Sequence, residues 1–331
     1  MKTKLALFFI GFTAIIHAQT FAPQVGIDGT TAIHKDDALF VDWANGVIIN
    51  RGYLDIALPN NGVVDYGETT NANGQANNNI VSLGDSGEAI LTFSQSITND
   101  QGADFAIFEN GFLLEEGSEL AFLELAFVEV STDGIEYVRF PAFSEVQTNT
   151  QTDSFGYLNA RNIHNLAGKY IANYGTPFDL EDLNNLIQGT TVNLNNINYI
   201  KLIDVVGTTN PNFATYDSEN NLINDPYPTA FSSGGFDLDA VGVIHNNSSA
   251  GIHNVELSLV KIFPNPVKDK LHIYTNQQIN TVTLFDVNGR EIISSSSKII
   301  DVSNLSKGIY FVKIIFPSHE IIKQFIKPCQ R

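Results

Sequence analysis

Short runs in which hydrophobic and polar residues alternate make up most of the chain. Residues 88–97 and 197–207 alternate in this way, and an apolar run at 120–130 leads through a Thr-Asp-Gly turn into a second run at 135–140. A period of two puts successive side chains on opposite faces of a β-strand, and an Asp-Gly turn between such runs is typical of a hairpin. Only residues 178–187 have a helical pattern, with Asp179 as N-cap. We therefore predict an all-β body that folds as a jelly-roll β-sandwich.

The strand expected at residues 236–243 carries two carboxylates within an apolar run. Strict alternation places Asp237 and Asp239 on one face of this strand. Val241 and Val243 would follow on the same face. Two like charges so close together repel each other and resist burial. Either a cation neutralises the pair, or both side chains lie at a solvated end of the strand.

The C-terminal residues 261–331 contain three further β-rich blocks and predict a small β-sandwich. Its marked positions are Pro264, Asn265 and Pro266 at the start, Gly289 in the middle, and Gly308 and Tyr310 before the last strand. These blocks, in this order, resemble the type A C-terminal sorting domain of the type IX secretion system of Bacteroidetes. An ordinary accessory β-sandwich is the alternative.

That resemblance implies a small C-terminal Ig-like β-sandwich and a route of export. The family passes through the periplasm, is recognised by an outer-membrane translocon through this domain, and commonly has the domain removed. We therefore expect a secreted or cell-surface protein on the exterior of the outer membrane, with the translocon as a partner.

The N-terminus has the three parts of a signal peptide. Lys2 and Lys4 precede an apolar run at 5–16, and cleavage is expected between Ala18 and Gln19. The apolar run is too short to span a bilayer, and no later run is long enough, so we expect no transmembrane segment. The expected order is a signal peptide at 1–18, the body at 19–248, a linker at 249–260 and the sorting domain at 261–331.

The formal net charge of −18 is unevenly distributed along the 331 residues. Residues 19–260 contain 6 Lys and Arg against 31 Asp and Glu, whereas residues 261–331 contain 10 against 5. An acidic body argues against nucleic acid or an anionic membrane as a partner and favours cations or neutral ligands. The single cysteine, Cys329, excludes an intrachain disulfide and a zinc–thiolate site.

Three stretches of the body resemble galactose-binding-like jelly rolls, a group that includes discoidin domains and many carbohydrate-binding modules. They are 128–140, 200–207 and 236–244. The resemblance implies a structural calcium ion. Residues 81–93, 104–112, 165–180 and 233–245 are also similar to a group of uncharacterised bacterial cell-surface proteins.

Acidic residues in three parts of the body are candidate calcium ligands, because calcium takes six to eight oxygen atoms from carboxylates, amides and carbonyls. The candidates are Glu109, Asp204, Asp217, Asp225, Asp237 and Asp239. The loop at 215–228 alternates acidic and amide residues as a calcium loop does, but it lacks the glycine and the final Glu of an EF-hand. A catalytic role of Asp237 and Asp239, with a second carboxylate across a cleft, is the alternative.

Four aromatic residues in loop-like segments are candidate ligand contacts: Trp43, Tyr170, Tyr174 and Tyr227. Exposed Trp and Tyr rings stack on the faces of sugars, although rings in such places also pin loops to a sandwich. Glu124 and Glu129 are expected on opposite faces of one strand, as rim residues or calcium ligands. His164 and His245 are expected to be structural or solvated.

These patterns lead to one functional hypothesis and two alternatives. The hypothesis is a non-enzymatic binding protein of the cell surface, with a calcium-stabilised body that holds a glycan or another nutrient-type small molecule. The alternatives are a glycan-active hydrolase or lyase that uses carboxylates of the body, and a structural or adhesive surface protein.

Overall fold

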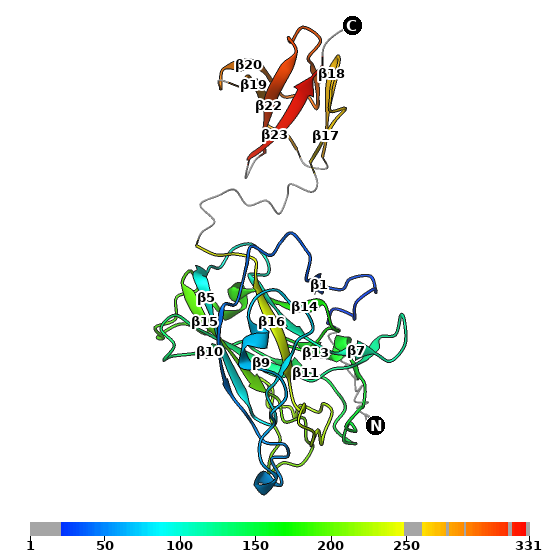
Figure 1. The fold of residues 1–331 in the computed structure, drawn as a ribbon, viewed down its shortest axis with the longest axis vertical. Coiled ribbons are helices and arrows are strands. Elements are labelled where there is room, and N and C mark those ends of the chain that lie inside the picture. Colours follow the sequence, from blue (N-terminus) through cyan, green and yellow to red (C-terminus); the bar gives the residue numbers. More distant parts are fainter. Residues whose placement is uncertain (1–20, 248–259, 276–277, 288, 317–319, 329–331) are drawn as a thin grey trace, which may run out of the picture. The chain divides into compact units, whose positions relative to one another are not determined.

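The chain folds into two compact units, each with a hydrophobic core of its own (Figure 1). The computed structural model describes residues 21–247, 260–275, 278–287, 289–316 and 320–328. These residues form β-strands and short 3-10 turns, so the prediction of an all-β protein is confirmed. The expected signal peptide, with Ala18 and Gln19, and nearly all of the expected linker lie outside the described residues and stay predictions.

The first unit, Met1–Ala250, is built around two antiparallel sheets. In sheet order, the first contains β1 (Ile33–His34), β14 (Tyr174–Phe178), β6 (Phe105–Glu109), β16 (Asp237–Val243) and β2 (Asp42–Trp43), and β4 (Val81–Ser82) also pairs with β16. The second contains β10 (Val138–Arg139), β9 (Ala126–Ser131), β15 (Ile197–Asp204), β5 (Glu88–Ile97) and β3 (Gly46–Asn50).

Both sheets bury side chains in one hydrophobic core. Leu91, Val128 and Leu202 come from the second sheet, and Ile107 and Leu238 from the first. Burial of apolar surface contributes about 25 cal/mol per Å², so this shared core is the main reason why the two sheets pack together. The β-sandwich is therefore confirmed, whereas the finer likeness to galactose-binding-like jelly rolls stays a prediction.

The hairpin expected around Asp133 is present. Val138 of β10 pairs with Val130 of β9. The Asp133 carboxylate accepts the N–H of Ile135 at 2.8 Å, and Gly134 has a φ of +75°. Glycine adopts this left-handed conformation without the steric cost that a side chain brings, so the Asp-Gly pair closes the turn.

The single strand expected at 120–130 is broken in two, so this prediction is wrong. β8 (Leu120–Phe122) joins a small sheet with β12 (Leu158–Asn159) and β7 (Phe112–Leu113), whereas β9 begins at Ala126 and belongs to the sandwich. Between them, the N–H of Leu125 turns away and donates to the carboxylate of Asp225 at 3.1 Å. The break leaves Glu124 at one end of the sandwich. A further short pair consists of β11 (Phe143–Ser144) and β13 (Ile163–His164).

A β-bulge interrupts β16. Leu238 is paired with Glu109 of β6, and Ala240 is paired with Phe108, the adjacent residue of β6. From Leu238 to Ala240 the chain moves two positions along β16, while its partner β6 moves only one. Asp239 is therefore the extra, unpaired residue of the bulge.

The bulge changes the face on which the side chains of β16 lie. Leu238 before the bulge and Val241 and Val243 after it all lie in the main core. The expectation that Asp237 and Asp239 share a face with these two valines is therefore wrong, because the extra residue shifts the alternation by one position. Asp237 and Asp239 are nevertheless 6% and 1% exposed, so the alternative in which both lie at a solvated end of the strand is wrong.

The helix expected at 178–187 is a single 3-10 turn. β14 continues to Phe178, and the turn η4 occupies only Leu180–Leu183. Asp179 is its N-cap, as expected, and accepts the N–H of Glu181 at 2.9 Å. The other 3-10 turns are η1 (Pro59–Asn61), η2 (Thr69–Ala72) and η3 (Ala160–Asn162).

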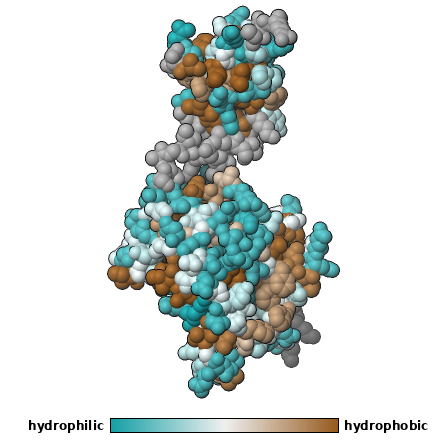
Figure 2. Space-filling model, viewed as in Figure 1, coloured by the Kyte–Doolittle hydropathy of each residue, from teal (hydrophilic) through white to brown (hydrophobic). Residues whose placement is uncertain are grey.

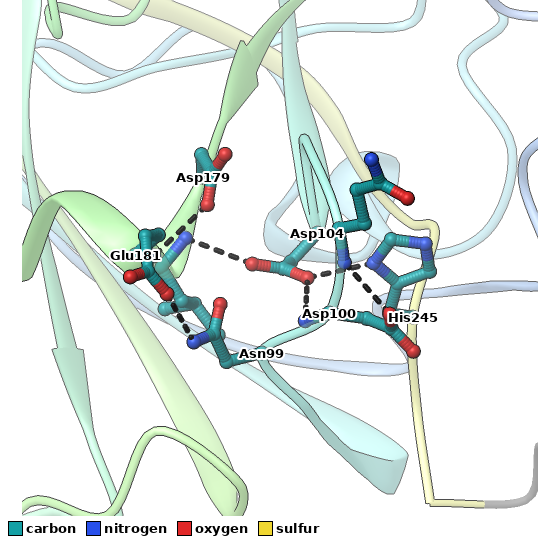
Figure 3. Close-up of polar contacts among 8 residues, drawn as sticks. Asn99, Asp100, Asp104, Asp179, Glu181 and His245 are labelled. Carbon is teal, nitrogen blue, oxygen red and sulfur yellow. Dashed lines mark hydrogen bonds and ion pairs between the residues drawn. The ribbon is translucent and has the colours of Figure 1, made fainter. Parts of the chain in front are cut away.

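A buried Asp–His pair joins three segments of the first sheet (Figure 3). Asp104 lies 2.7 Å from Nδ1 of His245 and also accepts the backbone N–H groups of Asp100 (2.9 Å) and Leu180 (2.8 Å). These contacts tie the start of β6 to the segments after β14 and β16. His245 is therefore a structural histidine, as expected.

The second unit, Gly251–Arg331, is a smaller sandwich. One sheet contains β17 (Lys261–Phe263), β18 (Lys270–Tyr274) and β21 (Ile299–Asp301). The other contains β20 (Glu291–Ser295), β19 (Thr281–Phe285), β22 (Gly308–Ile315) and β23 (Glu320–Lys327).

The marked positions of this unit have local structural roles. The Asn265 side chain, between Pro264 and Pro266, donates to the carbonyl of Gln324 and accepts the N–H of Ile326, so it holds the first loop against β23. Gly289 has a φ of +76° in the turn after β19, and Gly308 begins β22. The Tyr310 hydroxyl donates to the carbonyl of Ser306 at 2.9 Å.

Candidate functional site

Carboxyl groups gather at one end of the sandwich because the strand register brings several strand ends together. β6 ends at Glu109, which lies beside the first residues of β16, and β15 ends at Asp204, which pairs with the first residue of β9. The loops before β5 and β9 add Asp85 and Glu124, and the long loop between β15 and β16 adds Asp225. All these side chains are almost completely buried.

Four of these carboxyl groups line a small cavity of about 10 Å³. They are Asp85, Glu124, Asp204 and Asp225, and the rest of the wall includes Tyr227, Thr229 and Gly235. A volume of this size is that of a single water-sized occupant.

The four carboxyl groups differ in how many of their oxygen atoms already have partners. Asp204 uses both, because it accepts two backbone N–H groups at 2.7 and 3.0 Å. Asp225 and Asp85 each accept one backbone N–H, at 3.1 and 2.8 Å. The side chain of Glu124, which is 5% exposed, makes no hydrogen bond within the part of the chain that the structure describes. Glu124 is therefore the least constrained carboxyl group of the cavity.

Burial raises the pKa of these groups. Desolvation raises the pKa of Asp85 to about 6, and it raises the pKa of Asp204 and Asp225 well above the usual value. The pKa of Glu124 is also raised strongly, first by desolvation and then by the negative charges of the neighbouring carboxylates. The loop end therefore favours protonated carboxyl groups, or a cation among them.

A second cavity of about 180 Å³ adjoins the first and shares Glu124 and Thr229 with it. Its polar wall also includes Asn110 and Asp237, and its apolar wall consists of Phe112, Phe122, Phe155 and Phe231. We call this cavity the aromatic pocket. Burial raises the pKa of Asp237 to about 7.

The rings of the aromatic pocket form a continuous cluster that reaches the surface. Phe112 stacks on Phe122 at a centroid distance of 5.1 Å, and Phe155 lies 6.2 Å from Phe122 and 5.6 Å from Phe231. The exposed fractions of Phe112, Phe155 and Phe231 are 49%, 64% and 47%. Figure 2 shows apolar residues at the surface on the side of the body where Figure 1 labels β7, the strand of Phe112.

The six predicted calcium ligands do not converge on one point. Asp204 and Asp225 line the small cavity, and Asp237 lines the aromatic pocket. Asp217 accepts the N–H groups of Ser144, Glu219 and Asn221 and holds its own loop in shape.

Two further predicted ligands are tied to backbone groups. Asp239 accepts the N–H groups of Asn77 and Asn78, both at 3.1 Å. Glu109 accepts the N–H of Gly111 at 2.7 Å, and its other oxygen has no partner among the described residues. In that part of the chain, no three His, Cys, Asp or Glu side chains have the arrangement of a ready-made metal site. Calcium binding therefore stays a prediction.

Of the four predicted aromatic contacts, only Tyr227 lies at the loop end. It lines the small cavity and, with Phe155 and Phe231, a wider groove of about 540 Å³. Trp43 packs against Phe40 and Phe108.

The other two predicted contacts lie among structural neighbours. Tyr170 is 1% exposed and hydrogen-bonds to Thr31 at 2.8 Å. Tyr174 lies edge-on to His34. These positions favour the alternative in which such rings pin loops to the sandwich.

The sequence pattern missed several residues of the site. Asp85, Phe112, Phe155 and Phe231 were not singled out, and Glu124 was placed on a continuous strand. The sequence held one usable signal, a carboxylate inside the otherwise apolar run 120–130.

The comparisons say most about the second unit. Residues 261–328 match the family described as the secretion system C-terminal sorting domain. This is a sorting domain of type IX secretion. The match confirms the expectation from the sequence, and it shows that the protein is secreted or attached to the cell surface and is carried there by secretion machinery that recognises this domain.

The comparisons say less about the first unit. A search of the curated proteins found no match. A solved structure titled "Biofilm associated protein - BSP domain" is similar at 12% sequence identity and a TM-score of 0.19, over 76% of this chain and 50% of that one. The chain thus spans about half the length of that structure. Among the described residues, no helix is long and apolar enough to cross a membrane.

Proposed function

We propose that the first unit is a binding domain that the sorting domain carries to the cell surface, and that it holds a carbohydrate or a similar small molecule in the aromatic pocket. The single observation that carries the proposal is the exposed cluster of Phe112, Phe155 and Phe231 around a wall that holds Glu124 and Asp237. Large apolar rings are rarely left exposed as a cluster unless they meet a partner.

The chemistry of the pocket fits a ligand with flat apolar faces and polar edges. Aromatic rings stack on the faces of sugar rings, while carboxyl and amide groups hydrogen-bond to their hydroxyl groups. Asn110 and Asp237, which are 3.3 Å apart, supply such groups on one wall. The groove lined by Tyr227 and Phe155 extends the same surface and offers room for a longer ligand.

The test is a binding screen of oligosaccharides by isothermal titration calorimetry. We expect Phe155→Ala and Phe231→Ala each to weaken binding about tenfold, which is the loss of about 1.4 kcal/mol of stacking energy. Ile135→Ala is the matched control, because Ile135 is 85% exposed in the hairpin between β9 and β10. If the Phe variants bind as the wild type does, the pocket is not the binding site.

An assay for new reducing ends, run on the same oligosaccharides, tests the enzymatic alternative. Glu124 and Asp237 line one cavity. Most glycoside hydrolases use two such carboxyl groups, one as general acid and the other as base or nucleophile. New reducing ends that form with the wild type, and not with Glu124→Gln or Asp237→Asn, would replace the binding proposal by the hydrolase.

A further inference from the structure

We propose that the small cavity beside the aromatic pocket binds one divalent cation of the calcium type, held by Glu124, Asp225 and Asp85, with Asp204 as a fixed negative charge in the wall. The site differs from the calcium positions expected from the sequence, since Asp85 was not among them and Glu124 was expected, as a rim residue or calcium ligand, on an unbroken strand. Its test needs no sugar, so it can succeed or fail independently of the proposed binding function.

The first support is convergence. Asp85, Glu124, Asp204 and Asp225 come from four separate segments of the chain and line a space of about 10 Å³. No Lys or Arg side chain is among the residues that line it. Ionising four carboxyl groups around so small a cavity costs free energy through desolvation and mutual repulsion. A cation bound between them would offset both.

The second support is the number of oxygen atoms that remain available. Neither oxygen of Glu124 has a hydrogen-bond partner among the described residues, and the residue is 5% exposed. Its oxygens are not among the fully enclosed unpartnered atoms of that part of the chain, which agrees with their position at the edge of both cavities. Asp225 and Asp85 each use only one oxygen, Oδ2, for a backbone N–H, which leaves Oδ1 of each. A carboxyl group that accepts no hydrogen bond in so buried a residue is costly to ionise, and a cation in the cavity would offset that cost.

The third support is that the polar lining favours a hard cation. The side-chain atoms around the cavity that could coordinate a metal are oxygen atoms of the carboxyl groups, Thr229 and Tyr227. No Cys, Met or His is among the lining residues, so no sulfur or imidazole nitrogen is present there. Oxygen donors suit calcium, magnesium and manganese, and calcium accepts the least regular arrangement of these.

Binding of the cation requires a small movement of at least one ligand, because no three carboxyl groups of the described residues form a ready-made metal site. Glu124 can complete the set by side-chain rotation, because it has no hydrogen bond to break. Asp225 is already fixed: a Cβ on Gly207 would lie 1.5 Å from its Oδ1. Asp225 Oδ1 therefore packs directly against Gly207, and a side chain at position 207 would displace the Asp225 carboxylate.

Glu124 also connects the cation site to the aromatic pocket, because it lines both cavities. A cation that pulls Glu124 toward Asp225 changes the polar wall of the pocket. If the proposed ligand binds there, its affinity must then depend on the cation, and the cation affinity must depend on the ligand by the same factor.

The experiment measures calcium binding by the full chain after treatment with a chelator. Calorimetry should show one site per chain, and the melting temperature should rise by several degrees at a hundredfold excess over the dissociation constant. Glu124→Gln and Asp225→Asn should each remove this rise. Glu124→Gln is the more informative variant, because the carboxyl group makes no bond that the folded apo protein would lose.

Asp217→Asn is the matched control, because Asp217 is a buried carboxylate of the same acidic loop as Asp225 but is fully used by backbone N–H groups. It should keep the calcium-dependent rise. A rise that survives both Glu124→Gln and Asp225→Asn would overturn the location of the site, and no rise at millimolar calcium would overturn the proposal.

Terbium luminescence gives a second, local measurement. Terbium replaces calcium at oxygen sites and emits when a nearby tyrosine transfers energy to it, and Tyr227 lines the cavity. We expect emission that calcium displaces, and a several-fold weaker emission from Tyr227→Phe with calcium affinity unchanged. Emission that does not respond to Tyr227→Phe would place the cation elsewhere and contradict the proposal.

Discussion

At the scale of single residues, the most unusual group outside the loop end is Lys169. Its side chain is almost fully buried, and Nζ donates to the carbonyl of Ile163 at 2.8 Å. Desolvation lowers the pKa of Lys169 to about 7, because the charged ammonium loses its water. The cation also lies 5.5 Å from the ring of Tyr170, which offsets a part of this cost.

The lowered pKa predicts how stability depends on pH. Between about pH 7 and the ordinary pKa of lysine, the unfolded chain binds more protons at this position than the folded chain. The free energy of unfolding should therefore rise with pH in this window, by about 1.4 kcal/mol per unit from Lys169 alone. Lys169→Met should remove this part of the slope in urea denaturation at pH 7, 8 and 9.

Lys201 supplies the control for that measurement. Its Nζ lies 3.2 Å from the Glu129 carboxylate on the outer face of the sandwich. Lys201→Met should keep the wild-type slope between pH 7 and 9. If Lys169→Met also keeps it, the ammonium of Lys169 is solvated in the folded protein and the argument from burial fails.

Residue types and spacing predicted some of the site and missed the rest for a physical reason. Asp204 was identified as a carboxylate in an apolar strand, Asp225 by the alternation of acidic and amide residues in its loop, and Tyr227 as an aromatic residue in a loop-like segment. Phe155 and Phe231 were not, because exposed and buried phenylalanines look alike in sequence. Their exposure depends on where loops far apart in the chain meet, which no local pattern records.

At the scale of elements, irregularities in two strands decide where the functional side chains lie. The sequence predicted the strands that became β5, β15 and β16 from their period-two alternation, although the bulge interrupts this alternation in β16. It did not predict the break before β9 or the bulge in β16. Both depend on partners distant in sequence, the carboxylate of Asp225 in one case and the register against β6 in the other.

The bulge residue Asp239 should have a stabilising role that can be measured. Its carboxylate accepts the N–H groups of Asn77 and Asn78 and so fixes the segment before β4 to β16. Asp239→Ala leaves these donors unpaired and should lower the free energy of unfolding by about 1–3 kcal/mol. The amides of residues 77 and 78 should exchange hydrogen at least tenfold faster, as measured by NMR.

Asp37→Ala is the comparison for Asp239→Ala. Asp37 is exposed, and among the described residues its carboxylate accepts only the N–H of Leu39, within its own turn, at 3.0 Å. Its replacement should change the free energy of unfolding by less than about 0.5 kcal/mol. Equal effects of the two substitutions would show that the carboxylate at the bulge does not hold the distant segment.

At the scale of the whole molecule, charge is the property that the sequence predicts most directly. The acidic excess is confined to residues 19–260, and six buried acidic side chains of that part, Asp85, Glu109, Glu124, Asp204, Asp225 and Asp237, gather at one end of the sandwich. The remaining acidic groups give the body a negative surface that repels itself and lowers the stability of the compact state. Salt screens such repulsion over the Debye length, which falls from about 30 Å at 0.01 M to about 8 Å at 0.15 M.

The full chain should therefore melt at a higher temperature in 150 mM sodium chloride than in 10 mM at pH 7.5, by a few degrees, in the presence of a chelator. At pH 4.6, the isoelectric point given by the sequence, the net charge is near zero and the same increase in salt should have little effect.

Sodium chloride is the right probe, because a monovalent salt screens all charges and does not fill a site for a divalent cation. A calcium-induced rise that remains in 150 mM sodium chloride is then site binding, since millimolar calcium adds little to the screening that this salt already provides. If sodium chloride lowers the melting temperature at pH 7.5, attraction between opposite charges outweighs repulsion in this chain, and the acidic surface does not limit its stability.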